Sequence, residues 1–92
     1  MSVEETHRTI ETVFRMERAK LIAGLARMVR AVSQAEELAQ DALVTALSDW
    51  PGKGVPRNPG AWLMAAAKRR AIDGFRRNKM LKRKHEELGR DL

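Results

Sequence analysis

The 92-residue sequence contains no cysteine, which excludes disulfide bonds and thiolate metal sites. A domain this small without a disulfide framework is typical of a reducing compartment, so we predict a cytoplasmic protein. No run of about 18 apolar residues occurs, and the N-terminal stretch MSVEETHRTI is polar and acidic. The sequence therefore predicts no membrane-spanning segment, no export signal and no membrane partner.

Groups that support catalysis are also scarce. The two histidines, His7 and His85, lie near opposite ends of the chain. The carboxylates of Glu36, Glu37 and Asp41 crowd one predicted helix face, and nothing resembles a metal site or a nucleophile paired with a base. We therefore predict that the protein is not an enzyme and that it uses no cofactor and no small-molecule substrate.

Proline is rare, and all three prolines lie in the stretch PGKGVPRNP, residues 51–59, with two of the six glycines. Elsewhere Ala, Leu, Glu, Lys and Arg dominate, and these residues favour helix. We expect neither helix nor strand to run through 51–59, because proline lacks a backbone N–H and clashes with the preceding turn. The sequence predicts one all-α domain, a three-helix bundle with a restricted loop before its third helix.

Apolar residues recur at three- and four-residue steps before this loop. In the first third of the chain, this spacing predicts a helix over about residues 6–31, with Thr6 as its cap. Its single stripe, interrupted by Glu17, contains Ile10, Phe14, Leu21, Leu25, Met28 and Val32. A second helix is predicted over about residues 33–49, where Ser33 and Glu36 have the spacing of a capping box. Its outward face contains Glu36, Glu37, Gln40, Asp41 and Thr45.

The pair Asn58 and Pro59 predicts the start of a third helix, over about residues 58–81, because Asn caps free N–H groups and proline has none to lose. Each residue turns the helix by about 100°. The apolar side of this helix therefore contains Leu63, Met64, Ala67, Ala71, Gly74, Phe75 and Leu81. The opposite arc holds Trp62, Arg69, Asp73, Arg76, Arg77, Arg83 and Lys84. Residues 81–92 have few apolar anchors and are expected to be a fraying helix end or the start of a linker.

The charge is divided unevenly along the chain. Residues 1–50 hold 6 Lys and Arg against 8 Asp and Glu, a net −2, while residues 51–92 hold 12 against 4, a net +8. This division indicates a polyanion as the partner of the second half and a protein with basic residues as the partner of the first. Trp62 could stack an unpaired base. Alternatively, the charges are a solvated surface, Trp62 packs at the helix edge, and Asp73 pairs with Arg69, Arg76 or Arg77.

Two stretches resemble a known family. The stretch SQAEELAQDALVTALSDW is similar to Asp-Ala-Glu-Asp-Leu-Val-Gln-Glu-Thr-Phe followed by an Ala-Trp pair. The stretch AWLMAAAKRRAIDGFRR is similar to Trp-Leu-Tyr-Arg-Ile-Ala-Arg-Asn-Arg-Ala-Ile-Asp-Leu-Leu-Arg-Arg. Both patterns belong to region 2 of extracytoplasmic-function sigma factors, the promoter-recognition subunits of bacterial RNA polymerase. The resemblance covers roughly residues 10–80 and has its two blocks in the family's order.

The resemblance implies two partners and a set of contact residues for each. Docking on the coiled-coil clamp helices of the polymerase β′ subunit would involve Glu36, Glu37, Gln40, Asp41 and Val44. The loop from Trp50 to Asn58 would capture a base flipped out of the non-template strand of the −10 promoter element. Contacts to this DNA would come from Lys53, Arg57, Asn58, Trp62, Lys68, Arg69, Arg70, Arg76 and Arg77. An anti-sigma factor is a further partner that the family implies.

The sequence departs from the family pattern at several positions. Arg69 replaces a common Asn, which can change the preferred −10 sequence, Leu43 replaces Phe, and Gly74 replaces Leu. A complete member also carries a region 4 helix-turn-helix, so the resemblance implies an isolated region 2 domain over residues 1–80. Two alternatives stay open, a helical module that binds a protein regulator and a generic basic bundle that binds nucleic acid.

Overall fold

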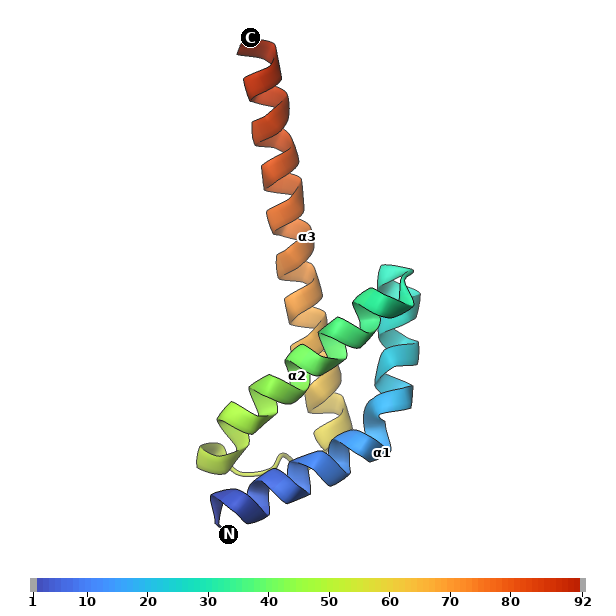
Figure 1. The fold of residues 1–92 in the computed structure, drawn as a ribbon, viewed down its shortest axis with the longest axis vertical. Coiled ribbons are helices and arrows are strands. Elements are labelled where there is room, and N and C mark those ends of the chain that lie inside the picture. Colours follow the sequence, from blue (N-terminus) through green and yellow to red (C-terminus); the bar gives the residue numbers. More distant parts are fainter. Residues whose placement is uncertain (1, 92) are drawn as a thin grey trace.

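The computed structural model describes residues 2–91, with side chains described through residue 89. Three helices follow one another, α1 (Val3–Val29), α2 (Val32–Lys53) and α3 (Pro59–Asp91), and no strand occurs among these residues. Figure 1 shows α1 changing direction about halfway along its length, α2 crossing α3, and α3 extending far beyond both. The predicted all-α three-helix fold is confirmed.

The start of α1 differs from the prediction. Ser2, not Thr6, is its N-cap, because the Ser2 Oγ accepts a hydrogen bond of 3.1 Å from the Glu5 N–H. Thr6 already lies in the helix and is buried, and its hydroxyl donates to the Ser2 carbonyl at 2.9 Å. Arg30 ends the helix in the left-handed region, with φ 59°.

Helix α2 differs from the prediction at both ends. It begins after Ala31, which provides no side-chain cap, so Ser33 lies inside the helix and forms no capping box. Val32, predicted in the stripe of the first helix, is instead the first residue of α2 and is exposed. The helix also continues through Pro51 to Lys53, contrary to the prediction for residues 51–59. A proline this close to a helix end removes one backbone N–H without breaking a long run of hydrogen bonds.

Helix α3 starts as predicted, because the Asn58 Oδ1 accepts a hydrogen bond of 3.1 Å from the Ala61 N–H and Pro59 is the first helical residue. It then continues past residue 81 to Asp91 without a break. Its 33 residues would span about 50 Å at 1.5 Å per residue, which accounts for most of the 59 Å long axis of the molecule. The C-terminal half of α3 projects away from the other two helices (Figure 1).

The hydrophobic core lies where the three helices cross. Its buried residues are Ile10, Phe14, Leu21 and Leu25 of α1, Ala35, Leu38, Ala39, Ala42, Ala46 and Trp50 of α2, and Leu63, Ala67 and Ala71 of α3. Alanine dominates on α2 and α3, which lets these helices approach closely, while Trp50 and the α1 side chains fill the remaining space. The predicted apolar side of α3 extended to Phe75 and Leu81, which are 45% and 48% exposed. The buried part of this side ends at Ala71, and neither Phe75 nor Leu81 belongs to the core.

No helix within residues 2–91 is both long enough and apolar enough to cross a membrane.

Gly74 and Gly54 allow a matched test of the local backbone. A Cβ placed at either glycine meets no described atom within 4 Å, but Gly54 has φ 92° whereas Gly74 is helical. We expect Gly74→Ala to stabilise the protein by about 0.5–1 kcal/mol, because alanine loses less backbone entropy in a helix. Gly54→Ala should destabilise it by about 1–3 kcal/mol, because its backbone conformation is essentially restricted to glycine. Urea unfolding followed by circular dichroism measures both, and equal shifts would contradict the expectation.

Candidate functional site

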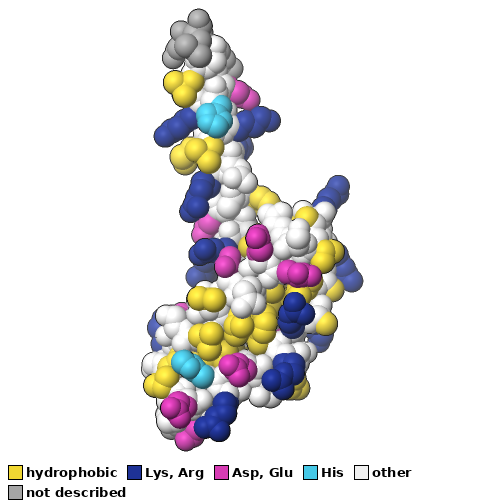
Figure 2. Space-filling model, viewed as in Figure 1, with side chains coloured by type: hydrophobic (Ala, Val, Ile, Leu, Met, Phe, Trp, Pro, Cys, Tyr) yellow, Lys and Arg dark blue, Asp and Glu magenta, His cyan; other side chains and the backbone are white. Residues whose placement is uncertain are grey.

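One exposed side of α2 carries the residues predicted to dock on a protein partner. Figure 2 shows acidic side chains gathered over the first half of α2, close to basic side chains of α3. We call the following five residues the acidic face: Glu36, Glu37, Gln40, Asp41 and Val44. Asp41 is half-buried and the other four are exposed, Val44 at 57%. The acidic face lies opposite the buried alanines of α2, so all five side chains share one accessible surface.

The predicted DNA-binding residues of α3 are exposed, except for the half-buried Trp62, but they do not form a single surface. Trp62, Arg69 and Arg76 are spaced seven residues apart, which places them within about 40° of one another around the helix. Arg70 lies toward α2, where it contacts Asp41. Lys68 is two positions before Arg70 and therefore points about 160° away from it. Lys68 directly precedes Arg69 and therefore lies about 100° from it around the helix, away from the row that begins at Trp62.

A cleft of about 280 Å³ lies between α2 and α3. It adjoins the point where the connecting loop leaves α2 at Lys53. Its lining residues are Thr45, Asp49, Lys53, Trp62, Ala65, Ala66 and Arg69. Three predicted DNA-binding residues, Lys53, Trp62 and Arg69, therefore share one cavity. Asp49 was not among the predicted site residues, although its spacing of four residues from Lys53 was a signal for the ion pair of 3.8 Å that these residues form.

Trp62 has a packing role as well as a place in the cleft. Its ring meets the ring of Trp50 edge to face, with centroids 5.2 Å apart and an interplanar angle of 72°. Trp50 is only 2% exposed, and its Nε1 has no hydrogen-bond partner among the described residues. Trp62 therefore packs at the helix edge, as the alternative proposed, and it also lines the cleft.

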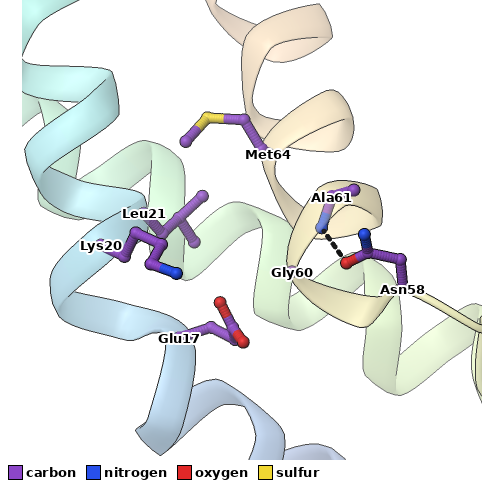
Figure 3. Close-up of a pocket in the computed structure, with 7 residues that line it drawn as sticks. All are labelled: Glu17, Lys20, Leu21, Asn58, Gly60, Ala61 and Met64. Carbon is purple, nitrogen blue, oxygen red and sulfur yellow. Dashed lines mark hydrogen bonds between the residues drawn. The ribbon is translucent and has the colours of Figure 1, made fainter.

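Arg57 and Asn58 belong to the loop and are exposed, but they do not line this cleft. Asn58 instead lines a second cavity of about 290 Å³ at the start of α3, together with Glu17, Lys20, Leu21, Gly60, Ala61 and Met64 (Figure 3). A Cβ built on Gly60 would lie 2.6 Å from the Glu17 Oε2, so this carboxylate sits directly against the first turn of α3. A negative charge there stabilises the helix start and disfavours a phosphate in the same place.

The described side chains form two ion pairs, and neither involves Asp73. The expected pairing of Asp73 with a neighbouring arginine was therefore wrong. Exposed pairs gain little in water and restrict two long side chains, so helical spacing alone does not hold an arginine. The pair that does form on α3 connects the Arg70 Nε to the Asp41 Oδ2 at 3.4 Å, with side chains 67% and 45% exposed. It joins the acidic face to the basic helix at the surface.

Comparison with known proteins identifies the family. The Sigma-70 region 2 family matches residues 13–80, so the chain belongs to this family. A protein of Rhizobium meliloti (strain 1021), named "Uncharacterized protein R00370", is 40% identical over 60 residues, which are 65% of this chain and 14% of that protein. The chain thus corresponds to a small part of this relative. No solved structure matches the chain.

Region 2 is the part of sigma factors that takes part in promoter recognition, together with core RNA polymerase and promoter DNA. Membership therefore supports a general role in transcription initiation and places the chain among transcription-factor domains without enzymatic function. The extracytoplasmic-function subtype and the individual contact residues stay predictions.

Proposed function

We propose that this chain is the region 2 domain of an extracytoplasmic-function sigma factor that docks on the polymerase β′ clamp helices and recognises and melts the −10 promoter element. The observation that supports this most is the presence of two exposed surfaces of opposite charge on neighbouring helices. The acidic face of α2 would bind the polymerase, and the row Trp62, Arg69 and Arg76 of α3 would bind DNA. This activity would take place in the cytoplasm, where we expect the protein.

The cleft beside Trp62 is the proposed position of a captured base. Unstacking a base costs a few kcal/mol, and stacking on an aromatic side chain returns about 1–3 kcal/mol per base. Trp62 lines the cleft and Arg69 places a cation there to hold an adjoining phosphate, while the second cation, Lys53, is paired with Asp49 at 3.8 Å. The cleft volume of about 280 Å³ lies near the lower end of the range for small-molecule pockets, about 300–1,000 Å³.

DNA binding is expected to depend strongly on salt. If the domain neutralises about five phosphates of a single strand, the logarithm of its affinity should fall with the logarithm of the salt concentration at a slope near −3.5. Fluorescence anisotropy with a labelled single-stranded oligonucleotide, measured across a salt series, determines this slope. Removing two cations, as Arg69→Gln with Arg76→Gln, should reduce its magnitude by about 1.4.

The exposed arginines Arg8 and Arg15 of α1 provide the control for this measurement. Changing both to Gln removes the same charge from a surface to which we assign no DNA contact. Equal slopes for the two double variants, or binding that does not respond to salt, would contradict the proposed DNA surface.

Exposed apolar side chains favour a second candidate function, binding of a protein regulator such as an anti-sigma factor. Phe75, Met80, Leu81 and Leu88 lie on the projecting part of α3 and are 45–62% exposed. A surface that binds another protein is typically a contiguous apolar patch, and Leu81 and Leu88, seven residues apart, lie on one side of α3. A pull-down with and without nuclease treatment separates a protein partner from one held through nucleic acid.

A generic nucleic-acid-binding bundle would show no preference for −10-like sequence.

A further inference from the structure

Two cavities of nearly equal volume lie beside the first turns of α3, and each adjoins one end of the loop between α2 and α3. The cleft beside Trp62, on the α2 side, has a volume of about 280 Å³. The other cavity, of about 290 Å³, lies between α1 and α3 and is lined by the loop residue Asn58 (Figure 3). We call it the α1-side cavity. A single strand that leaves the loop can enter either one, so the lining residues decide between them.

The charges of the two linings differ by one carboxylate. The cleft contains two cations, Lys53 and Arg69, against one carboxylate, Asp49, a net charge of +1. The α1-side cavity contains one cation, Lys20, against one carboxylate, Glu17, a net charge of 0. Without the charge of Glu17, both linings would therefore carry the same net positive charge and attract a phosphate backbone equally.

Glu17 is also placed where its charge acts most strongly on an anion. It is half-buried, interrupts the apolar stripe of α1, and takes part in neither of the two ion pairs among the described side chains. A Cβ on Gly60 would lie 2.6 Å from the Glu17 Oε2, so the carboxylate rests on the first turn of α3. The free backbone N–H groups of such a turn otherwise favour a phosphate. Glu17 therefore opposes DNA at the point of the α1-side cavity that would attract it most.

We propose that Glu17 determines on which side of α3 the single strand binds. Its carboxylate repels backbone phosphates from the α1-side cavity and leaves the cleft beside Trp62 as the favoured position. This inference rests on the proposed function, because it requires DNA at the start of α3. It adds a specificity-determining residue from α1, outside the predicted set of DNA contacts, that acts by excluding DNA.

Site-specific crosslinking tests this selection, because a chain without cysteine can be labelled at one introduced cysteine alone. Lys20→Cys places a short photo-crosslinker at the α1-side cavity, and Thr45→Cys places it at the cleft; both positions are exposed. The yield of crosslinks to a labelled single-stranded oligonucleotide is measured in each background with and without Glu17→Gln. This change removes the charge and keeps the size of the side chain. We expect the yield at position 20, relative to position 45, to rise about 1.7- to 5-fold.

Two further variants separate the charge of Glu17 from its other effects. Glu17→Asp keeps the charge and should keep the crosslinking ratio of the unchanged chain. Glu11→Gln removes a charge from an exposed position of the same helix and should also leave the ratio unchanged. Circular dichroism of all variants confirms that they fold.

The outcomes distinguish this inference from the proposed function. A ratio that stays constant in Glu17→Gln, or that shifts equally in Glu17→Asp or Glu11→Gln, would overturn the selection by Glu17. The proposed function would remain intact if these variants still bound the oligonucleotide in a salt-dependent manner, as measured by anisotropy. Absence of DNA binding by the unchanged chain would overturn the proposed function, and the selection with it.

Discussion

Reversing two charges on the acidic face, as Glu37→Lys with Asp41→Lys, is expected to abolish binding to a fragment of the polymerase β′ clamp helices. Each change replaces attraction to a basic partner with repulsion, and like charges placed together at an interface cost several kcal/mol. We expect affinity to fall by at least about 100-fold, equivalent to about 2.7 kcal/mol. Helicity should persist, because lysine is a good helix former and Glu37 is exposed.

Titration of the fragment, with circular dichroism of the same samples, measures this effect. The control is Glu86→Lys with Glu87→Lys, which changes the net charge equally at exposed positions near the far end of α3. This control should retain binding within a few-fold, since its charges lie away from α2. If the variant of the acidic face bound the fragment as well as the unchanged chain does, the assignment of this face to the polymerase would be wrong.

Replacement of Trp50 by alanine is expected to destabilise the protein by about 3–5 kcal/mol. Trp50 is the largest of the fully buried side chains, and it packs against Trp62 at the edge of the cleft. The neighbouring core residues of α2 are mostly alanines, which are too small to fill the resulting cavity. Since small domains have total stabilities of about 5–15 kcal/mol, this loss is a large fraction of the whole.

Urea unfolding followed by circular dichroism measures the stability of the Trp50→Ala variant. Ile72→Ala is the control, because Ile72 is 44% exposed on α3 and its truncation should change stability by about 0.5 kcal/mol or less. Trp50→Phe should lose much less than Trp50→Ala, because it keeps an aromatic ring and removes the indole N–H that has no described partner. A loss below about 1 kcal/mol for Trp50→Ala would contradict its role as a buried core residue.

Local signals predicted some helix ends and missed others. Asn58 followed by Pro59 combines two preferences that act within one turn, and the cap at α3 formed as predicted. Thr6 and Ser33 are also good capping residues by type. However, α1 is capped by Ser2, four residues before Thr6, and α2 begins at Val32, one residue before Ser33. Capping types therefore identify candidates, while the path of the chain decides which candidate is used.

The two candidate surfaces could be recognised from charge and helical spacing, because an exposed polar side lies opposite an apolar one. The cleft beside Trp62 could not be recognised from the sequence. It is lined by Ala65 and Ala66 of α3 and by Thr45 and Asp49 of α2, so it exists only where the two helices lie together. The family resemblance placed Lys68 and Arg70 in one set of DNA contacts, whereas they point to different sides of the helix. The binding roles of both surfaces stay predictions.

The sequence by itself determined the three helices, the outward direction of the acidic face and the excess of positive charge on α3. These features follow from residue type and from a period of 3.6 residues, both of which act over a few positions. Only the tertiary structure decided that Trp62 meets Trp50, that Asp41 reaches Arg70 and that Glu17 lies against Gly60. Each of these contacts joins different helices, so it depends on how the helices cross while they bury their alanine-rich faces.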